Sequence, residues 1–207
     1  MADGGDGGVD RVHQREWGRA FVADGYEVRR CERMDNGFVI VGPAADPVRV
    51  RGQGSAPEAL RMIAGKRHPF VSRGDDSGTH KKEMSLWKAA SVDARAASGA
   101  WYRETGSGMG ATLNTAVAMG AYTLTDRATW LKFQNKDGLA IMVEGDARLI
   151  NQYGVILVNP AKHPHVKARE GRIFIDWLTG AEGQRAIASY RIDGQQAFFP
   201  NAGQDGK

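Results

Sequence analysis

The sequence predicts an α/β protein, because short apolar runs typical of strands alternate with segments of helical spacing along most of the chain. Several of these runs end at glycine, proline or serine, and a residue suited to begin a helix follows soon after. The composition agrees with a globular protein, since 42% of the 207 residues are hydrophobic and 25% are charged.

The first half of the chain supplies two strand-to-helix units. Phe38–Val41 is expected to be a buried strand that stops at Gly42-Pro43. Ser55 or Ala56 lies near the cap of a short helix over 57–64. A second strand over 69–72 and a polar loop lead into a helix over 78–90, on which three residues share one face by spacing: Met84, Trp87 and Ser91.

The second half repeats the pattern. Strands are expected at 101–104, 121–124, 139–143 and 153–158. The stretch Ser107–Gly110 leads into a helix with Met109 and Leu113 on one side, and another helix is expected to be capped by Thr125 and to carry Trp130 and Leu131. Two final helices cover 166–179 and 182–190. The first of these has an apolar stripe that is expected to face the core: Ile173, Phe174, Trp177 and Leu178.

The most informative stretch is Ser72-Arg-Gly-Asp-Asp-Ser-Gly-Thr-His80, where a strand ends and a helix begins. A helix N-terminus presents unpaired backbone N–H groups and a partial positive charge, and Gly78 allows the backbone to approach a ligand closely. Ser77 and Thr79 add hydroxyl donors, and Arg73 adds a permanent cation. These groups make a cradle for an anion. The alternative is that Ser77 only caps the helix while Arg73 and Asp75 pair at the surface.

A second stretch, Glu104-Thr-Gly-Ser-Gly-Met-Gly110, also joins a strand end to a helix. Ser107 and the amides of Gly108 and Met109 could reach the same site. The alternative is a flexible loop in which Ser107 is a cap.

Other functional classes have less support. The five histidines are scattered without metal-ligand spacing, no Gly-x-Ser-x-Gly elbow is present, and Cys31 is the only cysteine, so neither a metal centre nor an enzyme is expected. Ser77 with His80 as base is the one catalytic pair to consider. The net charge of +4 is spread along the chain, which does not favour nucleic acid, and no apolar run is long enough to span a membrane.

Five ordered blocks resemble the tungstate-binding proteins of ABC transporters: Pro69–Glu83, Trp101–Gly110, Ala121–Trp130, Asn151–Pro160 and Tyr190–Gln196. The resemblance implies a type II periplasmic binding protein with two α/β lobes joined by hinge-crossing strands, the second lobe over 45–153 and the first over 1–44 and 154–207. It also implies an oxyanion ligand, an ABC permease as partner and no cofactor. Arg73 and Thr79 become the family's ligand contacts, with Ser72, Ser77 and Gly78 as neighbours and Ser107, Gly108 and Met109 nearby.

One departure concerns the beginning of the chain. Family members begin with a signal or lipoprotein segment and a Thr/Ser-rich first strand, whereas Met1–Gly8 is polar and glycine-rich. The first lobe is therefore expected to be incomplete. A periplasmic location follows from the family, and a non-transporting remnant or a cytosolic module of the same fold stays open as an alternative.

The choice of anion depends on Asp75. Arg73 to Thr79 also resembles the loop of phosphate-binding proteins, and phosphate that retains a proton needs an acceptor such as Asp75. Tungstate and molybdate carry no proton and need donors only. An Asp75 that points towards the ligand would therefore favour phosphate, and one that turns back to Arg73 or to a backbone N–H would favour tungstate.

Overall fold

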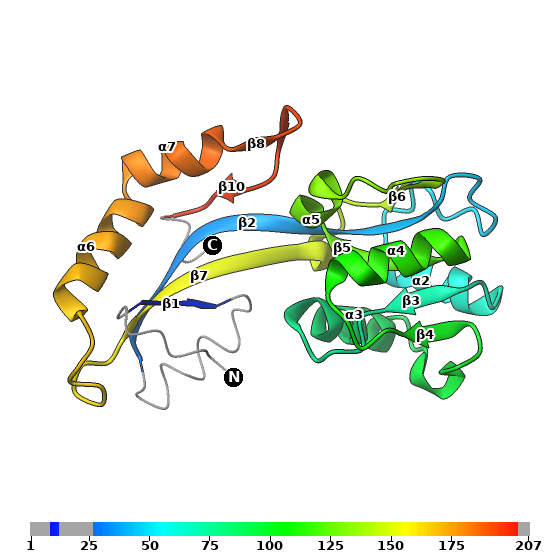
Figure 1. The fold of residues 1–207 in the computed structure, drawn as a ribbon, viewed down its shortest axis with the longest axis horizontal. Helices are drawn as coiled ribbons and strands as arrows, with labels where there is room; N and C mark the ends of the chain where they lie inside the picture. Colours follow the sequence, from blue (N-terminus) through cyan, green and yellow to red (C-terminus); the bar gives the residue numbers. More distant parts are fainter. Residues whose placement is uncertain (1–8, 13–26, 203–207) are drawn as a thin grey trace. The chain divides into compact units, whose positions relative to one another are not determined.

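A computed structural model describes residues 9–12 and 27–202 of the chain (Figure 1). The chain divides into two compact units, of which the larger comprises residues 37–150 and the smaller the described residues before 37 and after 150. The chain thus passes between the units at 36/37 and 150/151, whereas the lobes expected from the sequence divide at 44/45 and 153/154. The opening residues 1–8 lie outside the described part.

The larger unit is a sheet with helices on both faces. The strand order is β2-β5-β3-β4, with β6 also paired to β2. Strand β5 is parallel to β3 and antiparallel to β2, and β3 is parallel to β4. The elements are β2 (Glu27–Pro43), α2 (Ala56–Gly65), β3 (Phe70–Ser72), α3 (Gly78–Ala89), η1 (Arg95–Ala97), β4 (Tyr102–Glu104), α4 (Met109–Met119), β5 (Tyr122–Asp126), α5 (Arg127–Lys132), β6 (Leu139–Val143) and η2 (Ala147–Leu149).

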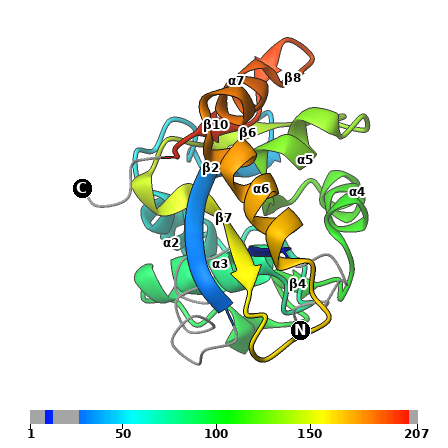
Figure 2. The same ribbon diagram turned by 90° about the vertical axis from the view of Figure 1, so that its left-hand side faces the viewer.

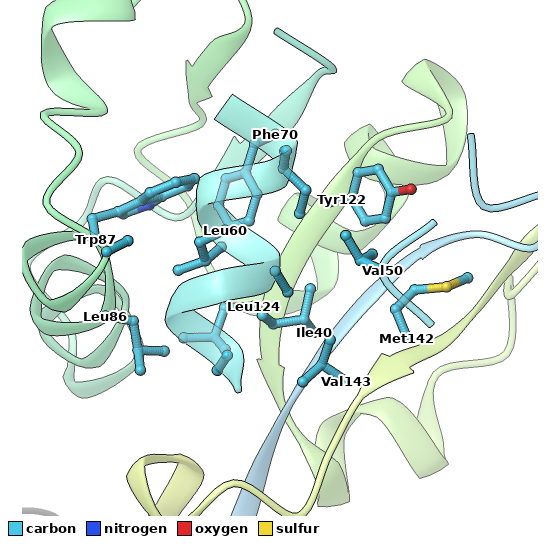
Figure 3. Close-up of a cluster of buried hydrophobic side chains, with 14 of the residues drawn as sticks. Ile40, Val50, Leu60, Phe70, Leu86, Trp87, Tyr122, Leu124, Met142 and Val143 are labelled. Carbon is cyan, nitrogen blue, oxygen red and sulfur yellow. The ribbon is translucent and has the colours of Figure 1, made fainter. Parts of the chain in front are cut away.

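The alternation of side chains along β2 explains why this sheet needs helices on both faces. Phe38 and Ile40 point into one apolar cluster, where they meet residues of α2 and α3. Val39 and Val41 point into a second cluster, where they meet residues of α4 and α5. A strand covered on both faces is apolar at consecutive positions, as the sequence shows here. Figure 3 shows Ile40, Leu60, Phe70, Trp87 and Leu124 gathered in the first cluster.

The smaller unit contains a separate, smaller core. Strand β1 (Val9–Val12) pairs antiparallel with β7 (Ile150–Val158), and β10 (Phe199–Pro200) pairs with β2. Helices α6 (Ala168–Thr179) and α7 (Ala181–Ser189) follow each other, and a hairpin of β8 (Arg191–Ile192) and β9 (Gln195–Gln196) comes next (Figure 2). The core residues are Cys31, Val155, Leu157, Ile175 and Leu178.

Two details of the elements differ from the sequence-based expectations. Asp126, not Thr125, caps α5, because its carboxylate accepts from the Thr129 amide while Thr125 is still the buried interior of β5. Helix α3 ends at Ala89, so Ser91 leaves the expected face and adopts a positive φ of 56°. The buried side of α3 contains Thr79, His80, Glu83, Leu86 and Trp87.

The expectation for the apolar stripe of α6 was wrong at three of its four positions. Ile173, Phe174 and Trp177 are exposed, and only Leu178 is buried. The buried side of α6 is formed by Gly171, Ile175 and Leu178, which recur at intervals of four and three residues. The apolar residues of α6 occupy both sides of the helix, so composition alone could not tell the core side from the exposed side.

Candidate functional site

Two strand-to-helix connections leave the same edge of the larger unit's sheet. Ser72 at the end of β3 is in register with Glu104 at the end of β4, and the two strands are parallel. Each strand then leads into a helix, α3 at Gly78 and α4 at Met109. The segments 73–77 and 105–108, which we call the first and second loop, therefore start side by side.

Hydrogen bonds join the two loops. The Thr105 amide donates to the Ser72 carbonyl at 3.0 Å, and the Ser107 amide donates to the Arg73 carbonyl at 3.3 Å. The Thr105 hydroxyl lies 3.2 Å from the Ser72 carbonyl and 2.9 Å from the Thr112 hydroxyl at the first turn of α4. Thr105 thus ties both loops to α4. The sequence analysis did not single it out, although a threonine directly after a strand end is the available signal.

Gly74 lets the first loop pass close to β4. Its φ is +60°, and a Cβ atom at this position would lie 2.8 Å from the Cβ of Glu104. A side chain here would meet both a strained backbone and a steric conflict. The closeness of the two loops therefore depends on a residue without a side chain.

Asp75 faces back into its own loop. Its Oδ2 accepts from Nε and Nη2 of Arg73 at 3.1 and 2.5 Å, and its Oδ1 accepts from the Ser77 amide at 3.2 Å. Burial acts to raise the pKa of Asp75, but the hydrogen bonds from Ser77 and Arg73 outweigh it and lower the pKa below its usual value. Asp75 is therefore an ionised structural group that orients Arg73 and the start of α3.

The helix N-termini supply backbone donors at the ends of both loops. Ser77 caps α3, because its hydroxyl oxygen accepts from the His80 amide at 3.3 Å. Within the described part of the chain, the amides of Gly78 and Thr79 have no acceptor. Helix α4 begins at Met109, and its N-cap residue, Gly108, makes no side-chain capping bond. Its first amides carry the partial positive charge of the helix end, as those of α3 do.

The eight predicted site residues divide by what they can offer a ligand. Arg73, Ser77 and Gly78 are partly exposed, and Gly108 is exposed. Ser72 and Thr79 are buried, and Met109 places its side chain in the apolar cluster next to α4, so that only its amide is available. The hydroxyl of Ser107 donates to the Thr105 carbonyl at 3.1 Å.

The alternative to an anion site was that Ser77 only caps the helix while Arg73 pairs with Asp75. Both of these contacts are present. They leave donors available. The Ser77 hydroxyl accepts in its cap and also acts on the Asp75 carboxylate, so the free donors at the start of α3 are the amides of Gly78 and Thr79. Asp75 occupies Nε and Nη2 of Arg73, and Nη1 has no acceptor among the described residues. Capping and anion binding are therefore compatible at this site.

His80 is poorly placed to act as a base for Ser77. It is buried, and its Nδ1 accepts from the Asp76 amide at 3.0 Å. Burial and the nearby Arg95 guanidinium lower the pKa of His80. The contact between Ser77 and His80 joins the hydroxyl to the backbone amide and does not involve the ring. The geometry fits a capped helix start and not a catalytic pair.

A buried polar network, which the sequence analysis did not identify, lies behind the loops. Glu83 of α3 is 2% exposed and accepts from Ser72, Trp87 and Tyr102 at 2.7, 3.0 and 2.8 Å. Burial raises the pKa of Glu83 to about 7, although the three hydrogen bonds act to lower it. In the sequence, the available signal for this network was the i, i+4 spacing of Glu83 and Trp87, which places both side chains on one side of a helix.

Across residues 9–12 and 27–202, no group of three or more His, Cys, Asp or Glu side chains is arranged to hold a metal ion. In the same residues, no helix has the length and apolar character needed to cross a bilayer. The two loops instead present N–H and O–H donors and one guanidinium, which is the donor set that a multiply charged anion requires.

Comparison with known proteins identifies the family of the chain. Residues 12–182 match the model of the PBP superfamily domain. The chain belongs to the PBP superfamily.

Within the PBP superfamily, the chain shares 39% identity over 206 residues with the tungstate-binding protein TupA of Peptoclostridium acidaminophilum, covering 98% of this chain and 71% of the relative. Its family is therefore that of the TupA tungstate-binding proteins, as the sequence resemblance implied. A candidate anion-binding protein of an ABC transporter from Haloferax volcanii is 48% identical over 97% of the chain, which spans only 59% of that relative's length.

The PBP fold is also evident in solved structures. The structure of TupA from Desulfovibrio alaskensis G20 superposes with a TM-score of 0.83 at 43% identity, over 94% of this chain and 78% of that one. The expected α/β architecture of a periplasmic binding protein is therefore confirmed.

Proposed function

We propose that this chain captures a tetrahedral oxyanion, tungstate or molybdate, as the substrate-binding component of an ABC transporter. The ligand would be held by the Arg73 guanidinium, the Ser77 hydroxyl and the amides at the starts of α3 and α4. The function is binding and release without a catalytic step. The partner is an ABC permease, and the place of action is outside the cytoplasmic membrane.

The orientation of Asp75 is the observation that carries the choice of anion. Its two carboxylate oxygens accept from Arg73 and from the Ser77 amide, so the carboxylate is turned back into the loop. A hydrogen phosphate ion would need an acceptor for its proton, and Asp75 does not present one to a ligand. Tungstate and molybdate are fully deprotonated and need only donors, such as those of Arg73 and the two helix starts. The names of the TupA relatives support the same choice.

Thermal unfolding with and without anions tests the proposal. A ligand at a hundred times its dissociation constant stabilises the folded state by roughly 2.7 kcal/mol, which raises the melting temperature by several degrees. We expect tungstate and molybdate to produce this rise and phosphate to produce none. A rise with phosphate alone would replace tungstate by a phosphate-type ligand. A cooperative melt that no oxyanion shifts would refute the binding activity of this chain.

A further inference from the structure

The carboxylate of Glu83 is connected to the first loop through a single hydroxyl group. Ser72 donates its hydroxyl proton to Glu83 Oε2 at 2.7 Å, and the Ser72 hydroxyl oxygen accepts from the Gly74 amide at 3.2 Å. The other carboxylate oxygen, Oε1, accepts from Trp87 and Tyr102. Glu83 is therefore separated by two hydrogen bonds from a backbone amide next to Arg73.

Among the described residues, no cation acts on the pKa of Glu83. All three of its hydrogen-bond donors are neutral, and the one charge that acts on it, the carboxylate of Glu104, is repulsive. A buried carboxylate without a cationic partner is costly to keep ionised. The pKa of about 7 expresses this cost and places the change of charge within the physiological range.

We propose that Glu83 is a positioning residue of the oxyanion site and that capture of the anion is coupled to uptake of a proton by this carboxylate. The inference depends on the proposed oxyanion-binding function. Its physical basis is the shared Ser72 hydroxyl, together with the burial of an uncompensated carboxylate behind an anion loop.

Two effects act in the same direction. A bound dianion next to the first loop adds negative charge near Glu83 in a poorly screened environment, which makes the neutral carboxyl more favourable.

The proton comes from solvent and binds to Oε2 of Glu83. The protonated Oε2 can then donate to the Ser72 oxygen, which releases the Ser72 hydroxyl proton from Glu83 and leaves it free to turn towards the loop. Affinity for the anion therefore falls as the pH rises through the pKa of Glu83.

Other titratable groups lie around α3, and most of them have partners of their own. From β4, Tyr102 donates to Glu83 and Glu104 repels it. Arg61 of α2 contacts Glu58 and the Ala90 carbonyl, and the Tyr122 hydroxyl of β5 donates to Asp46. Other charged groups near the site also have partners: Asp126 of β5 caps α5, Arg95 of η1 lies against His80, Arg73 pairs with Asp75, Lys81 pairs with Asp76, and Lys82 donates to the Arg148 carbonyl.

Calorimetric titration with tungstate, kept at micromolar concentration so that it stays monomeric, tests this coupling. Titrations in two buffers with different ionisation enthalpies give the number of protons taken up per anion bound. We expect a fractional uptake near pH 7 and a dissociation constant that rises up to about tenfold between about pH 6 and 8, the factor that one unit of pKa change produces. Glu83→Gln should bind tungstate without proton uptake and with a dissociation constant that does not depend on pH.

The matched control is Glu58→Gln, which removes a carboxylate from the exposed surface of α2 and should keep the proton uptake of the unmodified chain. If Glu83→Gln fails to fold, the two-buffer measurement on the unmodified chain still decides. Tungstate binding without proton uptake would overturn the coupling and leave the proposed function intact. Failure to bind tungstate at every pH would overturn both.

Discussion

Asp75 holds the guanidinium of Arg73 through two hydrogen bonds to one carboxylate oxygen, at 3.1 and 2.5 Å. The pair has two consequences for the anion site. The carboxylate is satisfied within its own loop, so it does not present an acceptor to a ligand. The guanidinium is fixed in a planar orientation before a ligand arrives, which lowers the conformational entropy lost on binding.

Arg73 should therefore be indispensable for binding and unimportant for folding. We expect Arg73→Ala to abolish the stabilisation by tungstate and Arg73→Lys to lose most of it, because an ammonium group cannot reproduce the planar donor fork. A hydrogen bond to a charged group contributes about 1.5–3 kcal/mol. Isothermal titration with tungstate measures the loss of affinity, and circular dichroism monitors the fold.

Arg61→Lys is the control for this substitution, since Arg61 lies on the surface of α2 and pairs with Glu58. It should leave the tungstate affinity unchanged. If Arg73→Lys bound tungstate as tightly as the unmodified chain does, the guanidinium would not contact the anion.

Two glycines with the same backbone conformation allow the packing of the first loop to be measured. Gly74 and Gly106 have φ values of +60° and +61°, but an added Cβ atom would lie 2.8 Å from the Glu104 Cβ at Gly74 and would meet nothing within 4 Å at Gly106. We expect Gly106→Ala to lower the free energy of unfolding by about 1–2 kcal/mol, the cost of the left-handed backbone. Gly74→Ala should cost a further 1–3 kcal/mol or so, because it also overpacks the loop.

Urea unfolding of the two variants gives this difference directly. Equal costs for Gly74→Ala and Gly106→Ala would show that the first loop moves away from β4 without penalty. The close approach of the two loops would then not be a constraint on the site.

The sequence was sufficient for the elements whose signal is local. The strand ends at Ser72 and Glu104 and the helix starts at Gly78 and Met109 were predictable because each combines an apolar run with glycine and hydroxyl residues. Arg73 directly follows a predicted strand end, so its guanidinium was expected at the edge of the sheet.

Features that depend on contacts between distant segments were not predictable. The role of Thr105 requires the register of β3 with β4, and the environment of Glu83 requires side chains from α3, β3 and β4 to meet. The cap of α5 was misassigned by one residue, because Thr125 and Asp126 are both good capping residues and only the length of β5 decides between them.

Glu83 should make the stability of the fold depend on pH. Because its folded-state pKa is raised to about 7 from 4.5, the folded state binds more protons than the unfolded state between these values. The contribution of Glu83 to the free energy of unfolding is therefore largest below about pH 4.5. It falls by a few kcal/mol at most as the pH rises towards 7. Chemical unfolding at several pH values without anion measures the slope.

Glu83→Gln cannot ionise, so it should flatten this slope while keeping the side-chain shape. Glu58→Gln, at the exposed surface, should leave the slope as it is. A slope that persists in Glu83→Gln would assign the pH dependence to another group.

Two isoleucines on α6 provide the sharpest test of the smaller unit. Ile175 is 8% exposed and packs in a core with Cys31, Val155, Leu157 and Leu178, whereas Ile173 is 60% exposed on the same helix. Truncating a buried isoleucine to alanine typically costs about 2–5 kcal/mol, because it removes apolar contacts and leaves a cavity. At an exposed helical position the change is within about 0.5 kcal/mol, and the higher helix propensity of alanine offsets part of it.

We therefore expect Ile175→Ala to lower the urea midpoint strongly and Ile173→Ala to leave it nearly unchanged. If Ile173→Ala were equally destabilising, the side of α6 that contains Ile173, Phe174 and Trp177 would be covered in the folded protein in solution.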